Sequence, residues 1–332
     1  MFATIAPRSI WWYGSRNRTA FPPVLYSFAR YKGTTAKGAI SVQSVSPHAP
    51  LGVSAALQGK VSEKPKPKIF DEFSLKDRVG IVSGGNRGLG LEMALALCEA
   101  GARAIYCLDL PTKPSAEWEK TRDFLKKMDI GAKLKYVSID VTDQQSLWNR
   151  VAEIGDEEGR MDVCVAAAGI LKAHTDCLRY PAAQFKEVLD VNTNGVLYTA
   201  QAAGQQMERF GHGGSIILIA SMSGTITNRD HAWVSYNSSK SAVLQMARSM
   251  ACELGEKNIR VNSLSPGHIY TSMTAAYLDK QPHLLEKWSN LNPMGRIGRP
   301  DEMRGVCVWL ASGASSFCTG SDIIVSGGHH SW

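Results

Sequence analysis

Residues 79–90 read VGIVSGGNRGLG, and this stretch decides the fold. Its apolar beginning, residues 79–82, is typical of a buried strand, and the segment from Leu91 to Ala100, which Gly101 ends, is typical of a helix. Strand, glycine-rich turn and helix in this order give the context in which a nucleotide binds. The glycines let the backbone approach a pyrophosphate, which the helix N-terminus stabilises. An ordinary turn between a strand and a helix is the alternative interpretation.

Further apolar runs recur along the chain, with helical stretches between them. They occupy residues 104–108, 135–139, 162–166, 215–220, 259–264 and 322–325. This alternation predicts an α/β fold, a single-domain Rossmann-type doubly wound parallel sheet with helices on both faces. Ligands of such a sheet bind at the carboxyl ends of its strands.

A long segment, residues 268–300, follows the sixth of these strands, and Pro282 and Pro293 interrupt it. A segment of this length at that edge of the sheet predicts a substrate lid. The candidate pocket walls, which could equally pack within the lid, are Tyr270, Met273, Tyr277, Trp288 and His231.

Two acidic positions at strand ends bear on the cofactor. Asp109 lies about 20 residues past the glycines, where a carboxylate accepts hydrogen bonds from a ribose diol and repels a 2′-phosphate, which favours NAD. Arg87 favours NADP as the alternative, because a guanidinium can pair with that phosphate. Asp140-Val141 ends the third strand and is placed to cap an adenine pocket. Asp140 is equally suited to N-cap the next helix, as are Thr142 and Asp143.

Tyr236 and Lys240 are four residues apart, which places both side chains on one face of a helix. Tyrosine ordinarily titrates near ~10, and a nearby ammonium lowers that pKa by favouring the phenolate. A tyrosine tuned in this way can exchange a proton with a substrate oxygen. Such a pair also occurs by chance on solvated helices, so it indicates a catalytic site only together with the other motifs in the chain.

Taken in order, the motifs of residues 70–332 closely resemble those of the short-chain dehydrogenase/reductase family. The matching stretches are Ser83-Gly84-x-x-x-Gly88-x-Gly90, Asp140-Val141, Val191-Asn192-Thr193-Asn194-Gly195, Ile219-Ala220-Ser221-Met222-Ser223-Gly224, the pair Tyr236 and Lys240, and Ser265-Pro266-Gly267-His268-Ile269-Tyr270-Thr271. One motif departs, because residues 166–169 read AAAG where the family has asparagine-asparagine-alanine-glycine. The missing asparagines normally brace the central sheet, so the departure puts that local bracing in doubt.

The resemblance implies a catalytic tetrad of Asn192, Ser221, Tyr236 and Lys240. Tyr236 would transfer the proton, Lys240 would lower its pKa and hold the nicotinamide ribose, and Ser221 would position the substrate oxygen. Asn192 would order a water that relays protons. The structural alternatives are a helix kink for Asn192 and a strand-end cap for Ser221. The implied cofactor-binding set is Ser83, Gly84, Asn86, Arg87, Gly88, Leu89, Gly90, Asp109, Asp140, Val141, Gly169, Tyr236, Lys240, Pro266, Gly267, Ile269 and Thr271, the last two as carboxamide contacts.

Within the family the chain most resembles fungal polyol dehydrogenases and ketose reductases, such as D-arabinitol 2-dehydrogenase, mannitol 2-dehydrogenase and sorbose reductase. The resemblance rests on residues 221–224, on the spacing of fifteen between Ser221 and Tyr236, and on the C-terminal GGHHSW of residues 327–332. It implies hydride transfer between a nicotinamide cofactor and a secondary alcohol or ketone, here a sugar alcohol and ketose pair. It also implies a homodimer or homotetramer built on the helices containing residues 184–209 and 236–254.

Two other functions remain open at this point. An NADPH-dependent 3-oxoacyl thioester reductase is compatible with Arg87 but not with Asp109. A dinucleotide-binding redox sensor or scaffold without catalysis belongs to another class, and the complete tetrad argues against it.

Composition excludes several classes of protein. The hydrophobic share of 44% and charged share of 20% are ordinary for a globular protein. The net charge of +7 suggests nucleic-acid binding, but residues 1–62 hold seven basic residues and no acidic one, so the remainder is neutral with 30 of each sign. The partner we expect is a small-molecule substrate. There is no apolar run of about 18 residues, which predicts no membrane span.

The acid-free, arginine-containing N-terminus is typical of a transit peptide. We therefore expect residues 1–31 to direct import into the mitochondrial matrix, with a cytoplasmic location as the alternative. Residues 32–68 are predicted to be a disordered linker, and residues 69–332 the catalytic domain. The seven cysteines are scattered without C-x-x-C, which fits a reducing compartment, and no spacing of cysteines and histidines predicts a metal site.

Overall fold

The computed structural model describes residues 51–57, 65–172, 175–271, 274–275, 278–279 and 282–332. The chain divides into two units, residues 1–63 and 64–332. The first unit contributes one described element, the short helix α1 (Gly52–Leu57), none of whose residues is buried. This helix falls inside the segment predicted to be a linker, whereas the predicted transit peptide lies outside the described residues.

The second unit is built on a parallel sheet with the strand order β3-β2-β1-β4-β5-β6-β7. The strands are β1 (Val79–Ser83), β2 (Ala104–Asp109), β3 (Lys133–Ser138), β4 (Val163–Ala166), β5 (Gly214–Ile219), β6 (Ile259–Pro266) and β7 (Asp322–Val325). The order reverses between β1 and β4, and in such sheets the crevice for a ligand opens at that point. The predicted α/β fold is confirmed.

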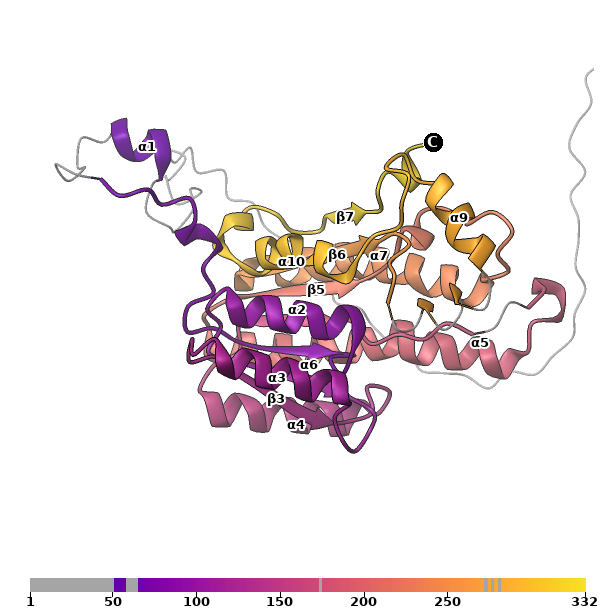
Figure 1. Cartoon of the computed structure of the whole chain (residues 1–332). Coiled ribbons are helices and arrows are strands. Elements are labelled where there is room, and N and C mark those ends of the chain that lie inside the picture. Colours follow the sequence, from indigo (N-terminus) through magenta and orange to yellow (C-terminus); the bar gives the residue numbers. More distant parts are fainter. Residues whose placement is uncertain (1–50, 58–64, 173–174, 272–273, 276–277, 280–281) are drawn as a thin grey trace, which may run out of the picture. The chain divides into compact units, whose positions relative to one another are not determined.

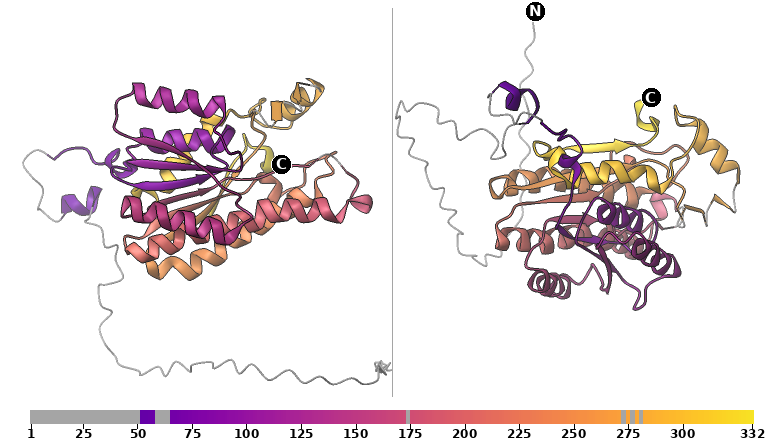
Figure 2. Two further views of the ribbon diagram at one scale, coloured as in Figure 1. Left: turned by 90° about the horizontal axis from the view of Figure 1, so that it is seen from below. Right: turned by 60° about the vertical axis from the view of Figure 1, so that its left-hand side comes forward.

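Helices cover both faces of this sheet (Figures 1 and 2). The α-helices described in this unit are α2 (Gly88–Glu99), α3 (Ala116–Lys127), α4 (Gln144–Glu158), α5 (Ala182–Leu189), α6 (Val196–Phe210), α7 (Val234–Leu254), α9 (Pro282–Asn290) and α10 (Arg304–Ala311). Short turns of 3-10 helix are η2 (Asp71–Phe73), η3 (Cys177–Arg179), η5 (Met222–Gly224), η6 (Gly255–Lys257), η7 (Pro300–Met303), η8 (Gly313–Ser315) and η9 (His329–Ser331). One core packs α4, α6 and α7 against the sheet, and a second core packs α2, α3 and α10 against the opposite face.

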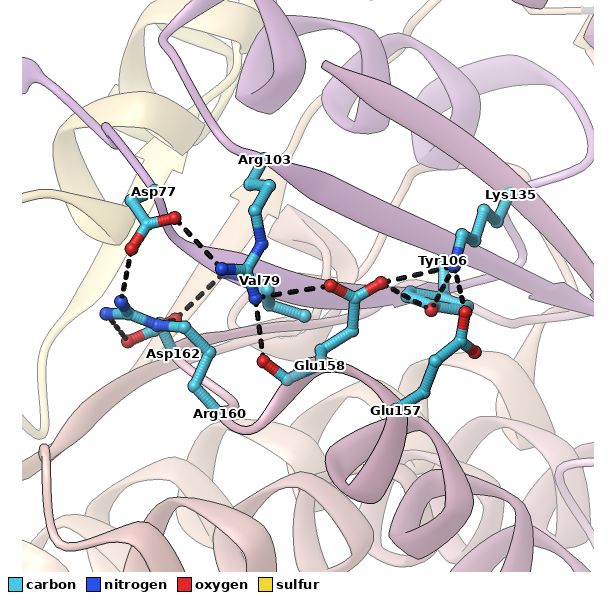
Figure 3. A network of polar contacts seen from close by, with 9 residues as sticks. All are labelled: Asp77, Val79, Arg103, Tyr106, Lys135, Glu157, Glu158, Arg160 and Asp162. Carbon is cyan, nitrogen blue, oxygen red and sulfur yellow. Dashed lines mark hydrogen bonds and ion pairs between the residues drawn. The ribbon is translucent and has the colours of Figure 1, made fainter. Parts of the chain in front are cut away.

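A polar network at the amino-terminal side of the sheet ties together β1, β2, β3 and β4 (Figure 3). The buried Asp162 carboxylate accepts hydrogen bonds from the Val79 backbone N–H at 2.8 Å and from Arg160 at 2.7 and 2.8 Å. Farther along, Tyr106 donates to Glu158 at 2.7 Å. The network therefore fixes these strands at their amino-terminal ends. Ligands of such a sheet bind at the opposite, carboxyl ends of the strands.

The bracing put in doubt by the AAAG sequence is supplied in part by Ser83. Its hydroxyl accepts a hydrogen bond from the Ala168 backbone N–H at 3.3 Å, and β4 remains paired with both β1 and β5. The central sheet therefore keeps its register without the asparagine side chains.

Candidate active site

The glycine-rich turn between β1 and α2 forms a cradle that tolerates no side chain. Gly84 and Gly88 have φ values of +67° and +57°, which favour glycine. A Cβ atom on Gly90 would lie 2.2 Å from the Gly84 carbonyl oxygen, so the first turn of α2 packs directly on the loop. This close approach brings the N-terminus of α2 up to the turn, an arrangement that fits the pyrophosphate of a dinucleotide cofactor.

Asp109 lies over this turn at the end of β2. Its two carboxylate oxygens accept hydrogen bonds from the backbone N–H groups of Asn86, at 3.1 Å, and Leu110, at 2.9 Å. These contacts fix the carboxylate beside the cradle and leave it further lone pairs for a ribose diol.

Two more charged side chains flank the same end of the cradle. Glu117, in the first turn of α3, accepts a hydrogen bond from the Gly88 backbone N–H at 3.1 Å. Arg87 is exposed and contributes to the cleft. The sequence alone did not indicate Glu117, because 29 residues separate it from its partner.

The structure separates the roles left open at residues 140–143. The Asp143 side chain caps α4 by accepting from the Ser146 backbone N–H. Asp140 instead accepts from both the backbone and the hydroxyl of Thr142, at 2.8 Å each. Asp140 and Val141 both contribute to the cleft.

Asn192 lies fully buried in η4 (Asp190–Gly195), one turn of π-helix between α5 and α6. Its side-chain oxygen accepts from the Ile170 backbone N–H at 2.8 Å. Its side-chain nitrogen donates to the Ile170 carbonyl at 2.9 Å and to the Ser239 hydroxyl at 3.1 Å. Asn192 thus links the segment after β4 to α7, and single π turns of this kind are frequent at functional sites.

Lys240 and Tyr236 lie on one face of α7, as their spacing predicts. The Lys240 ammonium donates to the Ile219 carbonyl at 2.8 Å and lies 5.7 Å from the centre of the Tyr236 ring. Burial lowers the pKa of Lys240 to about 8. Ser221, at the end of β5, accepts from the Ser223 backbone N–H at 3.1 Å and also hydrogen-bonds Tyr236.

The expected tuning of Tyr236 needs a correction. We expected Lys240 to lower its pKa, whereas in the structure burial raises the pKa of Tyr236 and the hydrogen bond with Ser221 lowers it in part. The physical reason is that both groups are buried, so desolvation disfavours the phenolate and the ammonium alike. The Lys240 ammonium, in addition, is directed to the Ile219 carbonyl.

Most of the predicted site residues converge on one cleft of ≈ 670 Å³ at the carboxyl ends of the strands. Those that contribute to it are Gly84, Arg87, Gly88, Leu89, Gly90, Asp109, Asp140, Val141, Gly169, Ser221, Tyr236, Lys240, Pro266, Gly267, Ile269 and Thr271. Ser83, Asn86 and Asn192 do not line the cleft, and all three are buried.

One side of the cleft is an aromatic wall made of Trp233, Tyr236, His268 and Trp288. The Trp233 ring meets Tyr236 and Trp288 edge to face, with 6.4 Å between ring centres in each pair, whereas His268 stacks on Trp288 at 4.1 Å. The sequence indicated Trp288 but missed Trp233 and His268. Their positions could have signalled them, because Trp233 lies three residues before Tyr236 and His268 follows Pro266-Gly267 directly.

The other predicted pocket walls have different positions. Tyr270 is exposed, does not line the cleft, and donates to Asp279 at 3.1 Å. His231 lies behind the wall, where its ring stacks on Trp233 at 4.1 Å. Met273 and Tyr277 are outside the described residues.

Within the part of the chain that the structure describes, no group of three or more histidine, cysteine, aspartate or glutamate side chains could hold a metal ion. None of the described helices combines the length and the apolar character needed to cross a membrane.

Comparison with known proteins agrees with this geometry. A family model described as enoyl-(acyl carrier protein) reductase matches residues 84–330. The sorbose reductase of Schizosaccharomyces pombe is 38% identical over 77% of this chain and 97% of its own length. The NADP-dependent mannitol dehydrogenase of Hypocrea jecorina is 35% identical over 79% of this chain and 96% of its own length. The crystal structure of gox2181 has a TM-score of 0.74 at 36% identity, covering 80% of this chain and all of that one.

The chain belongs to the short-chain dehydrogenase/reductase family. It is a nicotinamide-dependent oxidoreductase that acts on CH–OH groups.

Proposed function

We propose that this enzyme interconverts a sugar alcohol and its ketose with a nicotinamide cofactor. The observation that carries the proposal is the cleft itself, which joins the glycine cradle to Ser221, Tyr236 and Lys240 at the carboxyl edge of the sheet. The cofactor, when bound, supplies the hydride for reduction or accepts it in oxidation. Relatives named sorbose reductase and mannitol dehydrogenase support the choice of substrate class.

The residues of the cleft divide the remaining chemistry between them. Tyr236 donates a proton to the carbonyl oxygen during reduction and accepts it during oxidation. Ser221, which already hydrogen-bonds Tyr236, holds that oxygen in place. Lys240 replaces the proton, because a pKa of about 8 allows it to release one near neutral pH. Asn192 keeps the segment after β4 in register with α7 and orders the water that completes the relay.

For the cofactor we propose NAD, with NADP as the alternative. Asp109 and Glu117 place two carboxylates at the ribose end of the cradle, where a 2′-phosphate would be repelled. Arg87 is exposed at the same end and supports NADP. Replacing Asp109 with asparagine removes one negative charge, so the kcat/KM for NADPH relative to NADH should rise at least ~10-fold. An unchanged ratio would contradict the role of Asp109 in the choice between NADH and NADPH.

The competing activity is reduction of a 3-oxoacyl thioester with NADPH. The description of the matching family model and the exposed Arg87 favour it, whereas Asp109 opposes it. Oxidation of NADH and of NADPH by the full chain should be measured against xylulose, ribulose, fructose, sorbose and an acetoacetyl thioester. Turnover of a ketose with NADH supports the proposal. Turnover of the thioester alone, with NADPH, would contradict it and establish the alternative.

We also propose a homodimer or homotetramer and import into the mitochondrial matrix. A groove of ≈ 540 Å³ on α5, η4 and α7, close to the 88% exposed Leu178, supports association through these helices. The acid-free N-terminus supports import. A monomer in analytical ultracentrifugation would contradict the first proposal. A cytoplasmic location for a fluorescent protein fused behind residues 1–31 would contradict the second.

A further inference from the structure

We propose that the ion pair between Lys172 and Glu187 determines the charge of the substrate, so that the cleft accepts uncharged ketoses and disfavours anionic keto acids. The inference rests on the proposed function and deepens it, because it adds a charge requirement to the substrate class. It starts from Lys172, which lines the cleft and has no role in the binding of the cofactor or in the transfer of the proton.

The charged residues that line the cleft fall into two groups. Within the described part of the chain they are Arg87, Asp109, Asp140, Lys172 and Lys240. The first three lie at or beyond the carboxyl ends of β1, β2 and β3, on the cofactor side of the cleft. Lys172 follows β4, which pairs with β5, and Ser221 lies just beyond β5. Lys172 is thus on the catalytic side, where 31% of its side chain is exposed. Lys240 is on this side too, but it is buried and its ammonium donates to the Ile219 carbonyl.

The backbone that carries Lys172 is held beside the catalytic residues. A Cβ atom on Gly169 would lie 3.7 Å from Lys240 Nζ, so the chain passes close to the buried amine. The next residue, Ile170, exchanges two hydrogen bonds with the Asn192 side chain, at 2.8 and 2.9 Å. Lys172 comes only two residues later, so its position at the catalytic side of the cleft is fixed.

The charge of Lys172 is balanced from outside the cleft. Its Nζ atom donates to Glu187 Oε1 at 2.5 Å, and the Glu187 side chain is 52% exposed. Glu187 belongs to α5, which packs against α7, and it does not line the cleft. The cleft therefore contains the cation of the pair, while the anion that neutralises it stands behind.

This arrangement discriminates between substrates by their charge. A carboxylate that leaves water for the cleft is stabilised only if it meets a cation or several donors. A free ammonium attracts such an anion over several ångströms, whereas a neutralised pair exerts a much weaker attraction because its two charges largely cancel. A ketose that carries hydroxyl groups alone is indifferent to this balance. The intact pair therefore favours the uncharged substrate, and loss of the Glu187 charge should admit the anionic one.

The test compares L-sorbose with 5-keto-D-gluconate, in which a carboxylate replaces the hydroxymethyl group at C6 of sorbose. The quantity measured at low ionic strength is the kcat/KM for the keto acid divided by that for sorbose. Wild type should favour sorbose by at least ~10-fold, because the carboxylate of the keto acid finds the Lys172 ammonium already paired. Glu187→Gln leaves that ammonium unpaired, so the ratio should rise at least ~10-fold through the keto acid.

Two companion variants separate charge from packing. Lys172→Met removes the ammonium and leaves the Glu187 carboxylate unpaired, so the ratio should fall at least ~3-fold below that of wild type. The double variant that combines Lys172→Met with Glu187→Gln is uncharged, like the intact pair, and its ratio should return to within about 2-fold of wild type. Opposite shifts in the single variants and a return in the double variant are expected of a charge effect and not of a packing defect.

Salt and a matched control test the electrostatic cause. Sodium chloride at ~1 M should remove most of the rise in Glu187→Gln, because it shortens the Debye length to about 3 Å. Asp156→Asn breaks the ion pair of Asp156 with Arg209, at 2.7 Å, and should leave the ratio unchanged because neither residue lines the cleft. Exposed ion pairs contribute little to stability, so every variant should fold and bind NADH within about 2-fold of wild type.

An unchanged ratio in Glu187→Gln would overturn the inference, and so would shifts of the same sign in Glu187→Gln and Lys172→Met. If wild type reduces ketoses but prefers the keto acid to sorbose, the role of the ion pair fails while the proposed function stands. Wild-type protein that reduces no ketose would refute the proposed function, and this inference with it.

Discussion

The network at the amino-terminal edge of the sheet predicts a large difference between two aspartates that share one arginine (Figure 3). Asp162 and Asp77 both contact Arg160, at 2.7 and 2.9 Å. The Asp162 side chain is 7% exposed, whereas that of Asp77 is 56% exposed. We compare Asp162→Asn with Asp77→Asn, because both changes keep the size of the side chain and remove its charge.

The expected magnitudes follow from these contacts. Asp162→Asn removes the charge from the group that accepts the hydrogen bond of the buried Val79 N–H. It also replaces one of the two oxygens that accept from Arg160 with an NH₂ group, which cannot accept. Leaving buried partners poorly satisfied costs about 1–3 kcal/mol for the backbone group, and breaking a buried pair costs about 3–5. Because Arg160 is 25% exposed, water screens its ion pair with Asp162, and we reduce the energy expected for breaking that pair. The expected loss in the free energy of unfolding is about 3 kcal/mol in total. Asp77→Asn should cost under about 1 kcal/mol, as exposed ion pairs do.

Urea unfolding at neutral pH and one fixed protein concentration measures both values. For a unit of about 270 residues, 3 kcal/mol corresponds to a fall in Tm of about 5 °C. Activity at saturating substrate should be unchanged in both variants, because the network lies at the opposite edge of the sheet from the cleft. If the two variants lose the same free energy of unfolding to within about 0.5 kcal/mol, burial does not set how much each carboxylate contributes to stability, and the reasoning is refuted.

Two further predictions concern the cofactor cradle and the buried amine. Gly90→Ala should abolish NADH binding, because its Cβ would lie 2.2 Å from the Gly84 carbonyl oxygen. In the control Gly305→Ala the new Cβ has no atom within 4 Å, so this variant should bind NADH normally and gain about 0.5 kcal/mol of stability. Equal NADH affinities of the two variants in titration calorimetry would contradict the assignment of the glycine turn as the cofactor cradle. The pKa of Lys240 falls from 10.5 to about 8 on folding, so its contribution to stability is complete above pH 10.5 and is lost as pH falls through 8. The stability of wild type relative to Lys240→Met should therefore rise between pH 8 and 10.5, and parallel profiles would contradict the burial of the amine.

The sheet could be predicted from the sequence because its central strands are buried on both faces. Apolar runs therefore marked the interior strands β1, β2 and β4 to within one residue. The end of β6 was missed, because Ser263 and Ser265 satisfy their hydroxyls on Asp322 of β7 and the strand continues beyond its apolar part. A local pattern cannot show a hydrogen bond between residues about sixty positions apart.

The convergence of the site was also predictable, since each motif is local and the order of the strands brings their carboxyl ends together. The aromatic wall was not, because its rings come from separate segments and only the folded chain stacks them. The predicted direction of the pKa shift of Tyr236 was wrong for a related reason. Spacing on a helix reveals that Lys240 is near, but not that both side chains are desolvated and that the ammonium binds the Ile219 carbonyl.

The measurement that tests the account most directly is the effect of Tyr236→Phe on the ketose that wild type reduces best. The variant removes the hydroxyl that transfers the proton and leaves the cradle intact. We predict that kcat falls at least ~10²-fold while the Kd for NADH stays within about 2-fold of wild type. Tyr270→Phe, which removes a hydroxyl outside the cleft, should keep wild-type turnover. Retained turnover in Tyr236→Phe, or an equal loss of turnover and NADH binding, would contradict the central role of Tyr236.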